Sequence, residues 1–418
     1  MSVLKSPVLP RTPPPEIRRD LATALRLRRS HATVLTGVRR SGKSTLLAQL
    51  MRREGASCYC NLEDTRLFGM GPADFPTFLA VLDELAAPAL PVFLDEVQEV
   101  EGWQRLVRAL IDRERAVCLT GSNASLLGRE LGARLTGRHL SFEVFPFSFR
   151  EYCAYAGRDP GADSLGAYLE DGGFPAFLRE RDDQILQQLL RDVVHRDIAA
   201  RHGLRDTRHL MNLLLFLLAN TGQPCSFQRL TKTLTVPTVA QTSRYMGYLE
   251  DAYLLFAVPK FSPSFRQRVI APAKYYAIDC GLRRANALQA QPDLGHRLEN
   301  AAALHLRRLH PGAAAAPRQN HDTTSVTDHA RGATGSGHVC YAGERDSWEC
   351  DFLTGDEAIQ VCFELTPANR GRELRGAVEG ARLLGSRRAR VVTFDQTDQL
   401  REDGVAVDVV PAWQWMAE

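Results

Sequence analysis

The stretch Gly37-Val38-Arg39-Arg40-Ser41-Gly42-Lys43-Ser44 matches the pattern G-x-x-x-x-G-K-[ST], and its neighbours supply the structural context that this pattern needs. Residues 32–36 (Ala-Thr-Val-Leu-Thr) are apolar or β-branched and predict a buried strand. Residues 45–51 have an apolar helical face and predict a helix directly after the loop. A strand, a glycine loop and a helix in this order predict a phosphate-binding loop rather than a chance glycine turn.

The residue types of this loop suit the phosphates of a nucleotide. Gly37 and Gly42 permit backbone conformations that a side chain would obstruct, so the N–H groups of the loop can surround a phosphate. Lys43 adds a full positive charge, and the hydroxyl of Ser44 is a ligand for Mg²⁺. We therefore expect ATP and Mg²⁺ as cofactors, with nucleotide contacts from Gly37, Val38, Arg39, Arg40, Ser41, Gly42, Lys43, Ser44 and Thr45.

The composition is that of an ordinary globular protein, with 44% hydrophobic and 24% charged residues and a nearly neutral net charge of +3. The length of 418 residues predicts two to four domains. No apolar run reaches the ~20 residues that span a bilayer, and residues 1–15 contain no apolar signal core, so we expect a cytoplasmic protein with no membrane partner. The nine cysteines include no C-x-x-C pair, which predicts buried reduced thiols.

Further strands and helices follow the loop. Short apolar runs at 57–62, 92–96 and 116–120 alternate with helical stretches at 74–87 and 102–113, which predicts a parallel sheet covered on both faces. Ligands of such sheets bind at the carboxyl ends of the strands. The run 92–96 ends in two carboxylates, the Walker B pattern, so Asp95 is expected to hold Mg²⁺ and Glu96 to polarise the attacking water.

Three more residues complete the predicted catalytic set. Asn123 follows the next strand, where it would lie between the first two motifs and orient water near the γ-phosphate; capping a helix is the alternative role. Phosphoryl transfer also benefits from an arginine, often supplied by a neighbouring subunit, so Arg138 is the first candidate and Arg134 the second. Such an arginine implies a homo-oligomer, whereas an arginine paired with a surface carboxylate is the alternative.

The rest of the chain predicts additional units. Residues 154–204 predict helices with a sharp corner at 171–175, and three helices with an extended pair within 205–275 predict a winged helix. Such a module either binds DNA or packs on protein, and the candidate DNA contacts are Thr238, Gln241, Thr242, Arg244 and Lys260. Residues 1–16 predict a disordered tail, and residues 311–337 a disordered insertion in a second α/β unit.

Nine stretches together resemble a family of prokaryotic AAA+-type ATPases whose C-terminal domain has no characterised role. They are GVRRSGKST, FLDEVQ, LTGSNASLL, LTGRHLSFEVFPFSFREY, GGFP, YLEDAYLLF, KYYAIDCGLR, RLENAAALHL and WECDFLTGDEAIQVCFEL. The resemblance implies an α/β fold with four parts. These are a P-loop NTPase domain with a parallel sheet (17–153), a helical lid (154–204), a winged helix (205–275) and a restriction-endonuclease-like α/β domain (276–418).

A nuclease of that last fold pairs a helix glutamate and a strand aspartate with a following [DE]-x-K. The resemblance places Glu299, Asp351 and the segment 360–362 (Gln-Val-Cys) at these positions, so the acid and the lysine of the last motif are missing. No lysine follows Lys274, and an arginine cannot give up its charge. We therefore expect a degenerate, non-cleaving domain attached to an ATP-hydrolysing switch or motor that acts with DNA. The alternatives are a nucleotide-regulated DNA-binding regulator with little turnover and an ATP-linked metal-dependent nuclease.

Overall fold

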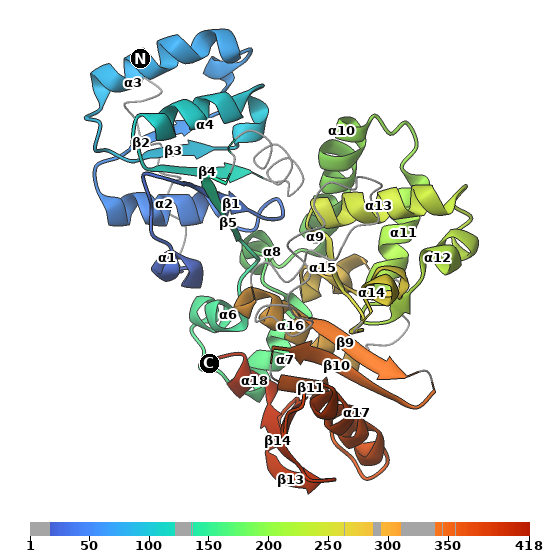
Figure 1. Cartoon of the computed structure of the whole chain (residues 1–418). Helices are drawn as coiled ribbons and strands as arrows, with labels where there is room; N and C mark the ends of the chain where they lie inside the picture. Colours follow the sequence, from blue (N-terminus) through green and yellow to red (C-terminus); the bar gives the residue numbers. More distant parts are fainter. Residues whose placement is uncertain are drawn as a thin grey trace. The chain divides into compact units, whose positions relative to one another are not determined.

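In a computed structural model the chain forms two compact units (Figure 1). The first ends at Phe147 and also takes in residues 251–253, and the second comprises the rest of the chain from Ser148 onward. The structure describes residues 17–121, 135, 137–262, 264–286, 294–310, 339–344, 346–355 and 357–418. The predicted tail 1–16 and the predicted insertion 311–337 lie outside the described residues.

The first unit contains the predicted parallel sheet. Its strands are β1 (Ala32–Thr36), β2 (Cys58–Asn61), β3 (Val92–Asp95), β4 (Val117–Gly121) and β5 (His139–Glu143), in the order β2-β3-β4-β1-β5. Every neighbouring pair is parallel. The helices α2 (Lys43–Glu54), α3 (Phe75–Leu85) and α4 (Trp103–Asp112) connect these strands, as the alternating pattern predicts.

Side chains alternate between the two faces of this sheet, because successive residues of a strand point to opposite sides. Val34 and Leu94 pack with Trp103 and the other apolar residues of α3 and α4, whereas Leu35 and Phe93 pack with the apolar face of α2. Figure 1 shows α3 and α4 on one side of the sheet and α2 on the other. Each fully buried side chain of this size stabilises the fold by about 1.5–3 kcal/mol.

The first helix of the chain, α1 (Asp20–Ala24), is short. Arg53 of α2 donates from Nη1 to the carbonyl oxygens of Ala22 and Leu25, at 2.8 Å each. In a longer helix these carbonyls would accept hydrogen bonds from N–H groups of the next turn. Here Arg53 satisfies them, and the backbone of Leu25 is already extended.

The second unit begins with helices. They are α6 (Phe149–Ala156), α7 (Ala162–Asp171), α8 (Pro175–Glu180), α9 (Asp183–Asp192), a π-helix (Val193–Ala199), α10 (Ala200–His202), α11 (Arg208–Ala219), α12 (Phe227–Thr233) and α13 (Val239–Asp251). An antiparallel sheet follows in the order β6-β8-β7, formed by β6 (Pro224–Cys225), β7 (Leu255–Val258) and β8 (Ala273–Ala277). The helices and the extended pair thus occur where the sequence predicts them, while a winged helix remains a prediction.

The predicted corner at 171–175 is present and depends on a close approach. Gly172 has a φ of 69°, and a Cβ there would lie 2.2 Å from Oδ1 of Asp279. Asp279 accepts a hydrogen bond from the N–H of Gly173 at 2.6 Å. The corner is therefore fixed by α15 (Cys280–Asn286), at whose start Asp279 lies.

The second unit also contains a six-stranded mixed sheet in the order β13-β14-β12-β11-β10-β9. Its strands are β9 (Cys340–Glu344), β10 (Trp348–Thr354), β11 (Glu357–Val361), β12 (Arg388–Thr393), β13 (Asp398–Glu402) and β14 (Val405–Pro411). The helix α17 (Arg370–Leu383) packs on β10, β11 and β12. The remaining helices are α14 (Phe265–Ile270), α16 (Leu294–Leu309) and α18 (Ala412–Trp415). This is the second α/β unit that the sequence predicts.

All nine cysteines are free thiols, as predicted. Burial is the main cause that raises the pKa of Cys60 and of Cys280, to about 12 in each case. Within the described part of the chain, no helix has the length and hydrophobicity needed to cross a bilayer.

Candidate nucleotide-binding site

The glycine loop connects β1 to α2 in a conformation that its two glycines make possible. Gly37 and Gly42 have φ angles of 146° and 97°, and a Cβ at Gly37 would lie 2.2 Å from the carbonyl oxygen of Val144. Lys43 is 4% exposed, and its Nζ donates to the carbonyl oxygens of Gly37 and Val38 at 3.0 Å each. The ammonium group is therefore held inside the loop, where it can exchange these carbonyls for phosphate oxygens.

Asp95 lies at the carboxyl end of β3 and is held by two hydroxyl groups. Its side chain is 3% exposed. The Thr120 hydroxyl donates to Oδ1 of Asp95, and the Tyr59 hydroxyl donates to Oδ2 at 3.2 Å. Burial and the neighbouring Asp95 carboxylate raise the pKa of Tyr59, so this phenol remains a donor. Thr120 and Tyr59 are thus site residues that sequence reasoning missed, although Thr120 ends a strand as the predicted site residues do.

Glu96 directly follows β3 and has a strained backbone. Its φ and ψ of 53° and 52° lie in the left-handed region, which is uncommon outside glycine and often found at functional sites. Its N–H donates to Oγ1 of Thr120 at 2.9 Å. Its carboxylate accepts a hydrogen bond from Nε2 of Gln98 at 2.5 Å. Thr120 thus contacts both acids, whereas the two carboxylate groups have different side-chain partners, Tyr59 and Thr120 for Asp95 and Gln98 for Glu96.

The oxygen donors at this edge of the sheet fit a magnesium ion. Ser44 is exposed on the first turn of α2, directly after the loop, and Asp95 contributes a carboxylate at the end of β3. Hydroxyl and carboxylate oxygens together with phosphate and water are the ligands that Mg²⁺ prefers. Because β4 lies between β1 and β3, the end of β4 separates the loop from the acids.

Of the three remaining catalytic candidates, the structure describes only Arg138. Asn123 and Arg134 lie outside the described residues. Arg138 precedes β5, accepts a hydrogen bond on its carbonyl oxygen from the N–H of Ala32, and forms an ion pair with Asp112 at 2.7 Å. Ala32 begins β1 and the glycine loop follows its end, so at about 3.3 Å per residue Arg138 lies roughly 15 Å from the loop of its own chain.

Arg19 is a buried residue beside the loop that the sequence analysis did not select. Its side chain is 4% exposed, with Nη1 donating to the carbonyl oxygen of Ser41 at 2.9 Å and Nη2 to that of Phe145 at 2.6 Å. Its guanidinium lies over the Phe147 ring, 5.3 Å from the centroid. A Cβ at Gly42 would lie 2.7 Å from Nη1 of Arg19, so this glycine permits the contact.

The candidate DNA contacts do not form one exposed face. Thr238 and Arg244 are exposed, and Gln241 donates from Nε2 to the Tyr245 hydroxyl at 2.6 Å. Thr242 is fully buried and pairs with the hydroxyl of Thr231 at 2.8 Å, so its prediction as a DNA contact is wrong. Lys260 follows β7 and lines a cavity together with residues of β9, β10 and α16.

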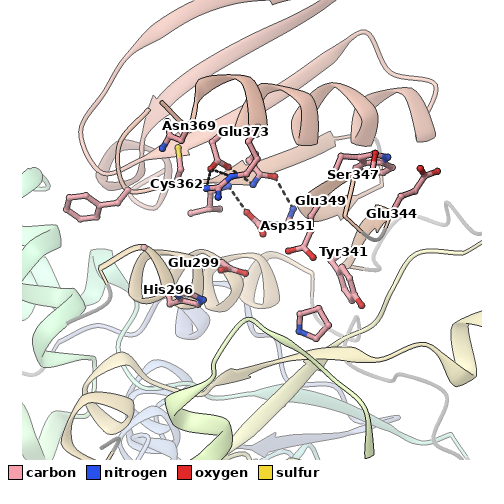
Figure 2. A pocket seen from close by; sticks show the side chains of 18 of the residues that line it. His296, Glu299, Tyr341, Glu344, Ser347, Glu349, Asp351, Cys362, Asn369 and Glu373 are labelled. Carbon is pink, nitrogen blue, oxygen red and sulfur yellow. Dashed lines mark hydrogen bonds and ion pairs between the residues drawn. The ribbon is translucent and has the colours of Figure 1, made fainter. Parts of the chain in front are cut away.

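This cavity has a volume of about 1180 Å³ and brings together the acids that the nuclease resemblance singled out. Figure 2 shows Glu299 of α16 with Glu349 and Asp351 of β10 facing the same space. Lys274 of β8 reaches all three with its Nζ, which lies 3.2 Å from Glu299, 2.8 Å from Glu349 and 2.9 Å from Asp351. No lysine follows position 274 in the sequence, but Lys274 itself is in contact with these acids.

The ionisation of this cluster follows from its burial. Burial alone would lower the pKa of Lys274, but Asp351 and Glu299 raise it well above its usual value, so the ammonium stays charged. Burial and the Asp351 carboxylate raise the pKa of Glu299 to about 7, against the opposing effect of Lys274. Among the described residues, no three His, Cys, Asp or Glu side chains are arranged to hold a metal ion.

Comparison with known proteins identifies the N-terminal part of the chain. A family model described as an AAA domain matches residues 29–153, and a model described as a domain of unknown function (DUF8612) matches residues 162–293. The uncharacterised protein MJ1544 of Methanocaldococcus jannaschii is 27% identical over 435 residues, which cover 96% of this chain and 90% of that protein. The crystal structure of Cdc6p from Pyrobaculum aerophilum covers 55% of this chain and 82% of its own, at 12% identity and a TM-score of 0.24, too low to support a conclusion.

An uncharacterised protein of Haemophilus influenzae is 31% identical over 356 residues, which cover 79% of this chain and 82% of that protein. The AAA-domain match agrees with the glycine loop, the parallel sheet and the paired acids of the first unit. The chain therefore belongs to the same family as the Haemophilus influenzae protein and carries the AAA-type P-loop domain of an ATPase.

Proposed function

We propose that this protein binds ATP with Mg²⁺ at the edge of the first unit's sheet and hydrolyses it, as a switch or motor that acts with DNA. The observation that carries this proposal is the pair Asp95 and Glu96 at the end of β3. Two hydroxyls hold Asp95, and Glu96 has a strained backbone. A structural strand end has no need of this arrangement, whereas phosphoanhydride hydrolysis needs one acid beside the metal and another beside water.

Each residue then has a distinct task. Lys43 exchanges the loop carbonyls for phosphate oxygens, and the loop N–H groups at the start of α2 bind the phosphates. Thr120 and Tyr59 keep Asp95 in place, with Ser44 as its partner in binding the metal. Glu96 orients the attacking water and accepts its proton. Bound Mg²⁺ supplies neutralisation of the phosphate charge.

The second unit is proposed to carry the action on DNA. Thr238 lies directly before α13 and Arg244 lies on it. Both side chains are exposed, so these two residues remain the candidate DNA contacts. The mixed sheet with its Lys274 cluster is proposed to be a degenerate, non-cleaving domain. DNA affinity that falls steeply with salt and depends on Arg244 would support this part of the proposal.

One set of variants tests the ATPase. Lys43→Ala is expected to abolish ATP binding, and Glu96→Gln to leave binding intact while lowering turnover by about 10²-fold or more. The matched controls are Lys232→Ala and Glu99→Gln, which alter exposed residues of the same type. Equilibrium binding of ATP and steady-state phosphate release, each with and without duplex DNA, provide the readouts. Wild-type protein that binds no ATP, or a Glu96→Gln variant with full turnover, would refute the proposal.

A further inference from the structure

The Lys274 ammonium lies at the centre of a group of carboxylates that the proposed ATPase does not use. Its side chain is 1% exposed and is in contact with Glu299, Glu349 and Asp351 at 2.8–3.2 Å. These carboxylates come from α16 and β10, while the lysine comes from β8 of another sheet. The cluster is therefore the point at which the two sheets and α16 meet.

Lys274 is held in this position from several sides. Its strand, β8, is the central strand of its sheet, with β6 and β7 as neighbours. Its Nζ also lies 5.5 Å from the centre of the Tyr341 ring, a cation–π distance. Because both backbone and side chain are packed, the ammonium cannot leave the carboxylates without disturbing the sheet.

The other polar groups of the cluster are also already engaged. Asp351 accepts a hydrogen bond from the N–H of Val361 with Oδ2 and contacts Lys274 with Oδ1. Glu299 accepts a hydrogen bond from the Tyr276 hydroxyl at 2.7 Å. Gln360, at the position of a second strand acid, donates to Glu373 at 2.8 Å.

A divalent cation in this cavity would need the carboxylate oxygens that the Lys274 ammonium already contacts. Mg²⁺ requires oxygen ligands at about 2.0–2.1 Å around its own centre, and it cannot share that centre with a buried ammonium of the same sign. We infer that Lys274 is the resident cation of this cavity and stands in the place of the metal ion that its carboxylates would otherwise bind. The second unit thus keeps these acids together and offsets part of their negative charge with its own side chain.

The inference is tested by metal binding to nucleotide-free protein, using Tb³⁺ luminescence sensitised by Trp348, which lines the cavity. Four proteins are compared: wild type, Asp351→Asn, Lys274→Gln and the double variant. We expect wild type to give no saturable emission that depends on Asp351. Lys274→Gln is expected to gain such emission, with binding tighter by about tenfold or more because a like charge has been removed. The double variant is expected to lose it again.

Two results would overturn the inference. One is wild-type emission that Asp351→Asn removes, which would mean that the cavity accepts a metal despite the lysine. The other is a Lys274→Gln variant that is folded by circular dichroism yet gains no emission. If that variant does not fold, wild type and Asp351→Asn decide alone, since Asp351-dependent emission contradicts the inference and its absence supports it. ATP binding by the first unit is measured separately and has no bearing on either result.

Discussion

Thr120 is the residue on which both acids of the candidate ATPase site depend. Its hydroxyl donates to Oδ1 of Asp95, and the same oxygen accepts the N–H of Glu96 at 2.9 Å. One side chain at the end of β4 therefore orients one acid by its carboxylate and the other by its backbone. Because Thr120 is fully buried, water cannot replace these hydrogen bonds when the hydroxyl is removed.

Thr120→Val keeps the shape of the side chain but removes the hydroxyl, so it should impair catalysis. An unsatisfied buried polar group costs about 1–3 kcal/mol, so we expect kcat to fall by about tenfold or more. The affinity for ATP should change less, because the loop and Lys43 remain intact. Thr120→Ser, which keeps the hydroxyl, is the matched control and should retain most of the activity. Equal kcat values for Thr120→Val and wild type in steady-state phosphate release would contradict this role.

Among the structural elements, the glycine loop is coupled to the segment 144–147, which follows β5 and ends the first unit. Arg19 bridges the two through the carbonyl oxygens of Ser41 and Phe145. The N–H of Val144 also donates to the carbonyl oxygen of Thr36 at 2.7 Å, just before the loop. These contacts hold the glycine loop against the last residues of the segment 144–147.

Replacing Arg19 should release this connection. Arg19→Met keeps most of the side-chain volume but removes two hydrogen bonds from a charged donor, each worth about 1.5–3 kcal/mol. We expect a lower free energy of unfolding and faster amide exchange at 37–42 and 144–147, measured by hydrogen-exchange mass spectrometry. Arg18→Met, at an exposed neighbour, is the control and should change neither. Unchanged exchange in Arg19→Met would show that the arginine does not hold the two segments together.

The same elements show what could be predicted from the sequence. The order of strand, glycine loop and helix and the alternation of strands and helices depend on local patterns, and these predictions are confirmed, whereas the roles of the loop and of the two acids stay predictions. The short extent of α1 depends on a distant residue, because Arg53 binds the carbonyls of Ala22 and Leu25 at its end. The contact of Lys274 with the acids could not be predicted for a related reason. Its partner Asp351 is 77 residues away, so the contact depends on how two sheets meet.

For the whole molecule, the position of Arg138 decides whether one chain is sufficient for hydrolysis. It lies at the end of the sheet opposite the glycine loop and is half exposed, with Asp112 as its ion-pair partner. An exposed pair of this kind contributes only about 0–1 kcal/mol, so the guanidinium is free to exchange partners at low cost. We therefore expect Arg138 to act on the γ-phosphate of a neighbouring chain, within an assembly of several copies.

Mixing two inactive variants tests this expectation directly. Arg138→Ala should bind ATP but lose turnover, by about 10³-fold for an arginine that acts in trans. Lys43→Ala cannot bind ATP, yet it still presents Arg138. If the arginine acts between subunits, the mixture should hydrolyse ATP faster than the sum of the two variants alone. Arg108→Ala removes the other arginine beside Asp112 and should leave turnover intact. Strictly additive rates in the mixture, under conditions where light scattering shows mixed assemblies, would mean that Arg138 supplies no charge to a neighbouring site.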